Sequence, residues 1–220
     1  MRSHDPLLGR RWGTGPAQAL VLALPGGEES SLRPRSRTAE VFLWPVIRAI
    51  AQRGRARGVV AHVVRYRHRG WNGEQADPVT DARRAIEEVR RRYGPLPVGL
   101  VGHSLGGRVA VHVAGESGVE AVALLAPWLE DVDPVGASSG RRLLVVHGAR
   151  DRHTDPEASY RFAVAARRAG ARIQRVQLPG GHLLMRHRRA WTALTAAFLV
   201  DTLSGHVRGP EREPGLRIPL

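Results

Sequence analysis

The feature that most constrains the fold of this chain is a regular alternation between short apolar runs and longer segments with helical spacing. Most of the runs are rich in Val, Leu and Ala without polar residues between them, which is typical of strands buried on both faces. The predicted strands lie at 17–25, 58–66, 97–103, 119–127, 141–148 and 171–179. The predicted helices lie at 38–54, 77–94, 104–115, 155–170 and 183–203.

This order predicts the fold class: an α/β protein with a doubly wound, mostly parallel sheet and helices on both faces. Asp77 and Asp155 are predicted helix N-caps, since each is followed by a proline and its helix stops at a glycine. The 220 residues suffice for one domain with a substantial core. We expect that domain at 15–204, with flexible ends at 1–14 and 205–220, which are rich in Gly, Pro and Arg.

Composition excludes some function classes. The chain has no cysteine, so it can use neither disulfides nor thiolate chemistry. The net charge is +14, but every basic residue is an arginine and the arginines are scattered along the chain. This pattern favours a solvated basic surface over a specific nucleic-acid or membrane site. No segment has the length and apolarity of a membrane span or of a signal peptide, so we expect a cytoplasmic protein.

The stretch VGHSLGG places Ser104 where a predicted strand ends and a predicted helix begins. In the pattern Gly-x-Ser-x-Gly, Gly102 and Gly106 remove side chains that would collide in a very tight turn. Ser104 would then expose its hydroxyl at the end of the strand. The free N–H groups of the helix favour developing negative charge there, and the backbone N–H of Leu105 is one predicted oxyanion donor.

A serine hydroxyl is a weak nucleophile and needs a base, with a third group that orients this base. Asp151 follows the strand at 141–148 and is the predicted acid. Asp155 is the less favoured candidate because it resembles a helix N-cap. Asp131 and Asp133, which follow the preceding strand, are the fallback.

His182, in the stretch PGGHLLM after the last predicted strand, is the predicted base. The glycines before it allow the loop to bring the imidazole over the edge of the sheet. The other histidines fit this role less well because they lie in helices, strands or the tail, or beside the serine: His62, His103, His112, His147, His187 and His206.

The second oxyanion donor is expected in the loop LPGG after the first strand, where small residues allow close approach of a backbone N–H. Gly27 is the predicted donor, and Glu28 is the neighbouring alternative. A metal site at His147, Asp151 and His153 is disfavoured, because the arginines of that loop repel cations.

Together the stretches LPGG, GHSLGG, HGARD and GGH, in this order, resemble the α/β-hydrolase family over almost the whole chain. The resemblance implies a nucleophile, an acid, a base and an oxyanion hole, and no cofactor. These roles fall on Ser104, Asp151, His182 and the N–H groups of Leu105 and Gly27.

The chain also departs from this family. Only a short connection links the predicted strands at 119–127 and 141–148, where larger members insert a lid. We therefore expect an open, shallow site without a cap domain. Little precedes residue 17, so the first antiparallel strands of the family are expected to be absent.

The expected function is hydrolysis of a small-molecule carboxylic ester or thioester through an acyl-enzyme on Ser104. Trp71 is predicted to stack on the substrate, and Arg67 or Arg69 could attract an anionic one, although a solvated surface explains these arginines more simply. The alternatives are an amide or C–C bond hydrolase with the same triad, and a non-catalytic binding protein on a hydrolase scaffold. The sequence does not indicate the oligomeric state.

Overall fold

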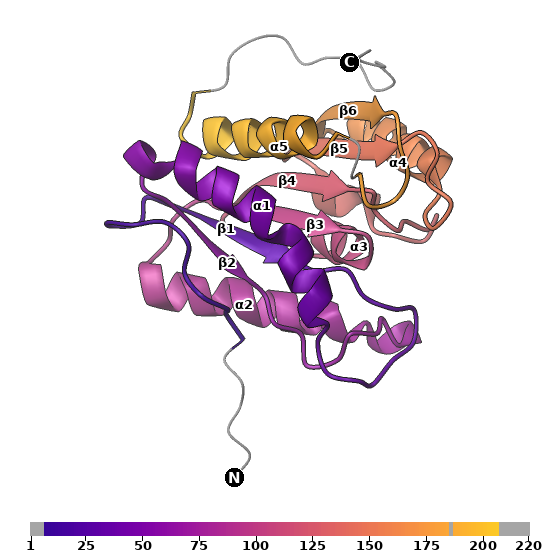
Figure 1. The fold of residues 1–220 in the computed structure, drawn as a ribbon, viewed down its shortest axis with the longest axis horizontal. Coiled ribbons are helices and arrows are strands. Elements are labelled where there is room, and N and C mark those ends of the chain that lie inside the picture. Colours follow the sequence, from indigo (N-terminus) through magenta and orange to yellow (C-terminus); the bar gives the residue numbers. More distant parts are fainter. Residues whose placement is uncertain (1–6, 185–186, 207–220) are drawn as a thin grey trace.

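The computed structural model describes residues 7–184 and 187–206 (Figure 1). Within these residues, six strands form one parallel sheet in the order β2-β1-β3-β4-β5-β6. The strands are β1 (Ala19–Leu24), β2 (Val59–Val63), β3 (Val98–His103), β4 (Val119–Leu125), β5 (Arg142–Gly148) and β6 (Arg172–Leu178). The α-helices are α1 (Arg37–Arg53), α2 (Asp77–Tyr93), α3 (Leu105–His112), α4 (Pro156–Arg168) and α5 (Arg188–Leu203).

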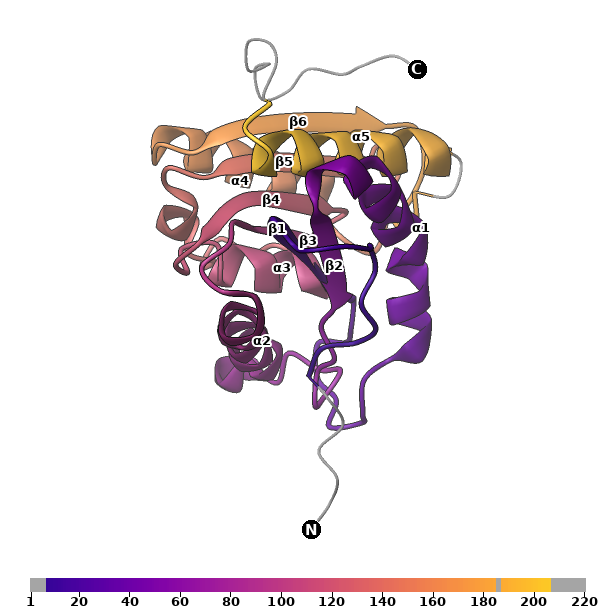
Figure 2. The same ribbon diagram turned by 90° about the vertical axis from the view of Figure 1, so that its left-hand side faces the viewer.

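Helices cover both faces of the sheet, which confirms the predicted doubly wound architecture. Figures 1 and 2 show α1 and α5 on one face and α2, α3 and α4 on the other. Successive side chains of β1 enter different cores, as the pleat of a strand requires. Leu20 and Leu22 pack in the core that includes α2, α3 and α4, whereas Val21 and Ala23 pack in the core that includes α1 and α5.

The order of the strands creates a crevice between β1 and β3. The chain passes from β1 through α1 to β2 on one side, and then through α2 to β3 on the other side of β1. The connections that leave β1 and β3 therefore run in opposite directions across the sheet. Ligands of open α/β sheets bind at such a reversal, outside the carboxyl ends of the strands.

The two predicted Asp-Pro helix starts differ in the structure. Asp155 is the N-cap of α4 and accepts hydrogen bonds from the backbone N–H groups of Glu157 and Ala158, as predicted. The prediction for Asp77 is wrong. Ala76 occupies the N-cap position without a side-chain cap, and the Asp77 carboxylate instead accepts a hydrogen bond from the Asn72 amide, at 2.8 Å.

The last helix begins later than predicted, at Arg188 instead of residue 183. Leu184 has a φ of 52°, which a right-handed helix does not allow. Residues 179–184 therefore form a loop at the carboxyl end of β6, and this loop carries His182. Residues 185 and 186 lie outside the described residues.

We expected residues 1–14 to be flexible, yet part of this segment pairs with β2. Leu8 and Trp12 form antiparallel bridges with Val64 and Ala61. Trp12 and Ala61 exchange two backbone hydrogen bonds of 2.9 Å, and the Leu8 side chain is buried. A short antiparallel segment thus covers the edge of the sheet at β2. Residues 1–6 and most of the predicted C-terminal tail, 207–220, lie outside the described residues.

The connection between β4 and β5 holds one short 3-10 helix, Val135–Ser138, and no inserted lid. The carboxyl ends of the central strands are therefore uncovered on that side. In the described part of the chain, no helix combines the length and apolarity that crossing a membrane requires.

Candidate active site

Ser104 lies at the junction of β3 and α3, and its backbone is strained. Its φ of 55° and ψ of −121° fall where residues with a side chain rarely lie. A Cβ on Gly102 would lie 2.1 Å from the carbonyl oxygen of Gly106, and a Cβ on Gly106 would lie 2.0 Å from that of Leu24. The turn therefore requires both glycines, as the sequence predicts.

Asp151 and His182 meet because β5 and β6 are neighbouring parallel strands and each residue follows one of them. Nδ1 of His182 lies 2.9 Å from Oδ2 of Asp151. Oδ1 of Asp151 accepts hydrogen bonds from the backbone N–H groups of His153 and Thr154, at 2.8 and 3.1 Å. The Thr154 hydroxyl donates to Oδ2 at 2.8 Å. Four hydrogen bonds thus fix the carboxylate against the imidazole.

These contacts keep Asp151 ionised. Burial raises the pKa of its carboxyl, but the hydrogen bonds from His182, Thr154 and His153 outweigh burial and lower the pKa to about 2. A carboxylate beside Nδ1 favours the tautomer in which Nδ1 carries the proton. Nε2 of His182 is then an acceptor, which is the state that a general base requires.

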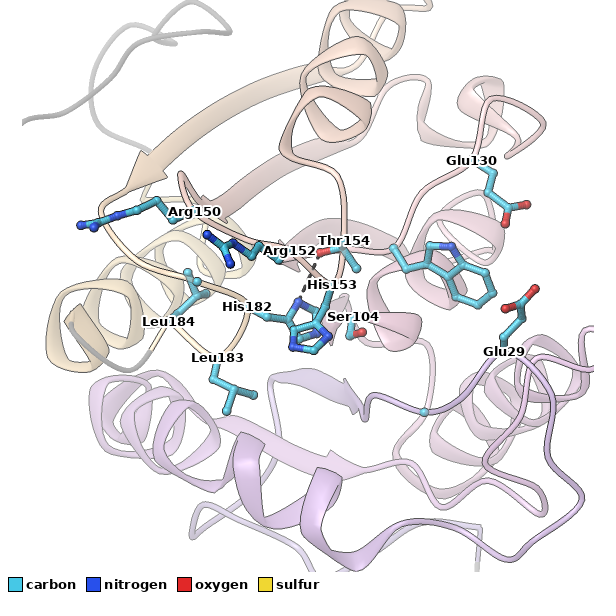
Figure 3. A pocket seen from close by; sticks show the side chains of 13 residues that line it. Glu29, Ser104, Glu130, Arg150, Arg152, His153, Thr154, His182, Leu183 and Leu184 are labelled. Carbon is cyan, nitrogen blue, oxygen red and sulfur yellow. Dashed lines mark hydrogen bonds between the residues drawn. The ribbon is translucent and has the colours of Figure 1, made fainter.

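Ser104 and His182 line the same cavity, which has a volume of about 970 Å³ (Figure 3). They also both line a smaller cavity of about 410 Å³. Among the described residues, no side chain bonds to Nε2 of His182. The hydroxyl of Ser104 and the imidazole of His182 therefore open onto one space in which a small molecule can lie.

The alternative carboxylates do not contact the imidazole of His182. Asp155 caps α4. Asp133 is buried, and its Oδ1 lies 2.9 Å from Nε2 of His112 and accepts a hydrogen bond from Nε of Arg108 at 2.8 Å. The Asp131 side chain is 86% exposed. Of the four aspartates that the sequence offers, the structure brings only Asp151 to His182.

The loop after β1 lies beside Ser104. The backbone N–H of Glu28 donates to the carbonyl oxygen of Arg69, at 2.8 Å. Among the described residues, neither the N–H of Gly27 nor that of Leu105 has an acceptor. Gly27 and Leu105 therefore keep free donors near the serine, whereas Glu28, the alternative to Gly27, does not.

The prediction that Trp71 lines the pocket is corrected by the structure. Trp71 is 7% exposed and belongs to the core. Its ring packs against His112, and the Arg108 guanidinium lies 4.2 Å from its centroid. Among the described residues, Trp128 is the tryptophan that lines the cavity at Ser104. Packing against His112 and Arg108 holds Trp71 in the core, and its place in a loop of the sequence does not predict these contacts.

Two residues behind Asp151 were not assigned to the candidate site from the sequence. The Thr154 hydroxyl lies 2.8 Å from Oδ2 of Asp151 and 3.2 Å from Nδ1 of His182. Nε2 of His147 lies 3.2 Å from the same carboxylate oxygen. From the sequence, His147 is a less favoured candidate base and a disfavoured metal ligand, and Thr154 has no distinguishing motif. Their roles depend on how the loop after β5 folds back.

His147 is fully buried, and burial lowers the pKa of its imidazole to about 4. It is therefore neutral near pH 7. Its Nδ1 has no partner among the described residues, whereas its Nε2 lies beside the Asp151 carboxylate. The tautomer with the proton on Nε2 is therefore favoured, because Nε2 can then donate to Asp151. The Asp151 carboxylate thus accepts from two histidines, one that faces the cavity and one that is buried.

His103 supports the loop that carries His182, the candidate base. Its Nε2 lies 3.2 Å from the carbonyl oxygen of His182, and the two rings lie 4.8 Å apart. Burial lowers the pKa of His103 to about 3. A neutral His103 can donate from Nε2 to this carbonyl without adding a positive charge beside the base.

The rim of the cavity carries charges of both signs. Figure 3 shows Arg150 and Arg152 on one side of Ser104, and Glu29 and Glu130 on the other. Within the described residues, the connection between β4 and β5 adds no lid over the space between them.

Comparisons with known proteins identify the family and the fold of this chain. The family model described as serine aminopeptidase, S33, matches residues 15–143, more than half of the chain. Esterase Pf2001 from Pyrococcus furiosus is similar in structure, with a TM-score of 0.67 and 14% identity over 85% of this chain and 83% of that one. No curated protein matches the chain in sequence.

Two further structures show the same fold. Est1E from Butyrivibrio proteoclasticus, solved with ferulic acid bound, has a TM-score of 0.65 and 14% identity, and the match covers 89% of this chain and 95% of that one. MGS-M1, an alpha/beta hydrolase from a Medee basin deep-sea metagenome library, has a TM-score of 0.66 and 18% identity over 86% of each chain. With the family match and this shared fold, the chain belongs to the serine aminopeptidase S33 family of α/β-hydrolases.

Proposed function

We propose that this protein is a serine hydrolase that cleaves a carboxylic ester or thioester of a small molecule through an acyl-enzyme on Ser104. The observation that carries the proposal is the Asp151–His182 hydrogen bond of 2.9 Å beside a cavity that both His182 and Ser104 line. An oriented base next to an exposed serine at a strand-to-helix turn is the arrangement that acyl transfer requires.

In the acylation half-reaction, Nε2 of His182 takes the proton of the Ser104 hydroxyl while Oγ attacks the carbonyl carbon. The carbonyl π electrons move onto oxygen, and the N–H groups of Leu105 and Gly27 stabilise this oxyanion. When the tetrahedral intermediate collapses, the bond to the leaving group breaks. His182 returns the proton to the departing alcohol or thiol. Asp151 stabilises the imidazolium throughout.

In the deacylation half-reaction, a water molecule replaces the alcohol. His182 removes one proton from water, whose oxygen attacks the acyl carbon and forms a second tetrahedral intermediate. Its collapse breaks the bond to Oγ of Ser104, and His182 gives the proton back to the serine. The carboxylic acid leaves, and the enzyme regains its initial state. The open cavity gives water direct access to this step.

Two similar structures support the choice of an ester. Pf2001 is described as an esterase, and Est1E was solved with ferulic acid, an aromatic carboxylic acid. The uncovered cavity at Ser104 suits a substrate with an exposed ester better than one that needs enclosure. We extend the class to thioesters because the same acyl chemistry applies to a thiol leaving group.

An amide substrate is the second candidate, because the family model is described as one of serine aminopeptidases. The same triad would serve, with an amine as the leaving group. A C–C bond hydrolase would also use this triad. A non-catalytic binding protein would keep the fold without needing an ionised acid hydrogen-bonded to a base.

The experiment is a panel of p-nitrophenyl esters, acyl thioesters and aminoacyl anilides of graded size. We expect turnover of esters or thioesters and a loss of about 10⁴-fold or more in kcat for Ser104→Ala. Turnover of anilides alone would establish the amide alternative. No turnover of any class, with no labelling of Ser104 by a fluorophosphonate, would establish the non-catalytic alternative.

A further inference from the structure

A second cavity lies away from Ser104, at the edge of the sheet next to β2. Its volume is about 730 Å³, and it shares no lining residue with the two cavities at the serine. The walls come from the N-terminal segment, the loop before α1, the chain after β2 and α2. Figure 2 shows the N-terminal segment passing along β2 between α1 and α2. The proposed hydrolase reaction does not use this cavity.

Arginines dominate the charged lining. Five of them line the cavity, and they come from three different parts of the chain: Arg35, Arg65, Arg67, Arg84 and Arg92. Among the described residues, only two carboxylates line it with them, those of Asp81 and Glu88. The cavity therefore has an excess of positive charge, and this excess is local and convergent, unlike the arginines scattered over the rest of the surface.

The carboxylates do not neutralise all of these arginines. Asp81 is held by Arg67, whose backbone N–H and Nε donate to its two oxygens at 2.8 and 2.7 Å. Arg35 pairs with Glu40 at 3.0 Å. Within the described part of the chain, Arg65 and Arg84 form no ion pair. At least two guanidinium groups at the cavity thus have no carboxylate partner in the part of the chain that the structure describes.

Two polar groups in the cavity wall also have unused hydrogen-bonding capacity. Nε of Arg65 and the hydroxyl of Tyr66 are buried without a hydrogen-bond partner among the described residues. Tyr66 is 4% exposed, and burial raises the pKa of its hydroxyl well above the usual range, so the group remains a donor. A buried donor without an acceptor costs free energy, which an anionic ligand would recover.

The remaining wall is apolar. Leu7, Leu8 and Pro34 line the cavity beside the arginines. A ligand that fills this space therefore needs an anionic end for the arginines and an apolar body for the leucines and proline. The planar guanidinium matches the oxygens of a phosphate in paired hydrogen bonds, and a dianion suits more than one unpaired arginine better than a monoanion does.

We propose that this cavity binds a small soluble phosphate monoester, with its phosphoryl group at Arg65, Arg84 and Tyr66 and its organic body on Leu7, Leu8 and Pro34. The site is separate from the proposed hydrolase site, so it would stand if the hydrolase assignment failed. The role of Tyr66 is to donate a hydrogen bond to a phosphoryl oxygen. Asp81 keeps Arg67 in place through the two hydrogen bonds that it accepts.

Isothermal titration calorimetry of the full chain with phenyl phosphate tests the proposal. The protein is first treated with a fluorophosphonate, so that an active Ser104 is blocked. We expect saturable binding with a dissociation constant below about 1 mM, and binding of benzoate that is at least about fivefold weaker. Arg65→Gln should weaken phenyl phosphate binding about tenfold or more.

Arg48→Gln is the matched control, because Arg48 is exposed on α1 outside the cavity and the substitution changes the net charge equally. It should leave the affinity within about twofold. Equal weakening by both substitutions would overturn the proposal, because it would indicate general attraction of anions to a basic surface. Absence of saturable binding would overturn it as well.

Tyr66→Phe separates ligand binding from folding. Because the buried hydroxyl has no partner, its removal should leave the melting temperature unchanged or raise it. The same variant should weaken phenyl phosphate binding about threefold to tenfold. An unchanged affinity in this well-folded variant would contradict the proposed contact. Ester hydrolysis by both cavity variants should equal that of the parent protein.

Discussion

At the scale of single residues, the turn at Ser104 depends on the absence of a side chain at Gly102 and Gly106. Gly106→Ala would place a Cβ 2.0 Å from the carbonyl oxygen of Leu24, inside the backbone of β1. The backbone must shift, and Ser104 shifts with it. We expect a loss of at least about 100-fold in kcat and a lower melting temperature.

Gly136→Ala is the control for this substitution, because nothing lies within 4 Å of a Cβ at that position. It should leave ester hydrolysis and the melting temperature nearly unchanged. Thermal unfolding and steady-state kinetics of the two variants test the argument. A Gly106→Ala protein with the parent kcat would show that the tight turn is not needed.

Thr154 offers a second test at this scale. Its hydroxyl donates to Asp151 and is buried, so Thr154→Val would replace a donor with a methyl group of similar size. With one donor fewer, the pKa of Asp151 should rise and the imidazole of His182 should be held less firmly. We expect kcat to fall about tenfold, and Thr154→Ser to retain most of the activity because it keeps the hydroxyl.

The buried histidines make stability depend on pH. The folded-state pKa of His147 is about 4 and its ordinary value is 6.5. Between these two pH values, His147 is protonated in the unfolded chain and neutral in the folded one. The contribution of a neutral, buried His147 to the free energy of unfolding is fully present above pH 6.5 and is lost as the pH falls toward 4. The loss is about 1.4 kcal/mol per pH unit in this window.

Denaturant unfolding of His147→Leu between pH 7 and 4.5 measures this contribution. The variant should be less sensitive to acid by the equivalent of about one proton, whereas His206→Leu, at an exposed position, should keep the parent slope. Identical slopes for all three proteins would mean that His147 is protonated in the folded state.

At the scale of elements, the sequence predicts where strands and helices lie because their signals are local. Buried strands such as β1 and β3 are unbroken apolar runs, and Asp155 is followed by the proline that a helix start favours. Asp77 has the same local pattern, yet its carboxylate accepts a hydrogen bond from the Asn72 amide instead of capping the helix. A contact from outside the local pattern decides between the two outcomes.

The candidate site follows the same division. Ser104, Asp151 and His182 are each found at the carboxyl end of a strand, where the order of elements places them. Trp71, Thr154 and the choice of Gly27 over Glu28 depend on how loops fold against one another. Hydrogen bonds between loops, such as that from the N–H of Glu28 to the carbonyl oxygen of Arg69, decide which way these groups point. The periodicity of the sequence does not predict such hydrogen bonds.

At the scale of the whole molecule, the N-terminal segment closes one edge of the sheet. Leu8 is buried against the core beside β2 although it lies eleven positions before the start of β1. Leu8→Ala should lower the free energy of unfolding by about 2 kcal/mol, at the low end for a buried leucine because the position lies at an edge.

Leu32→Ala is the matched control for Leu8→Ala, because Leu32 is 71% exposed. It should change the free energy of unfolding by less than about 0.5 kcal/mol. Chemical denaturation of the two variants gives the comparison. Equal, small effects would show that the N-terminal segment contributes little to the fold in solution.

The central claim is that Ser104 carries the acyl group during turnover. Rapid quenching of the enzyme with p-nitrophenyl acetate, followed by mass spectrometry of its peptides, measures this directly. The account predicts one acetyl group on the peptide that contains Ser104, and none on that peptide in Ser104→Ala. Release of acetate while that peptide stays unmodified at every quench time would contradict the account. Equal rates of p-nitrophenyl acetate hydrolysis by the parent protein and Ser104→Ala would contradict it as well.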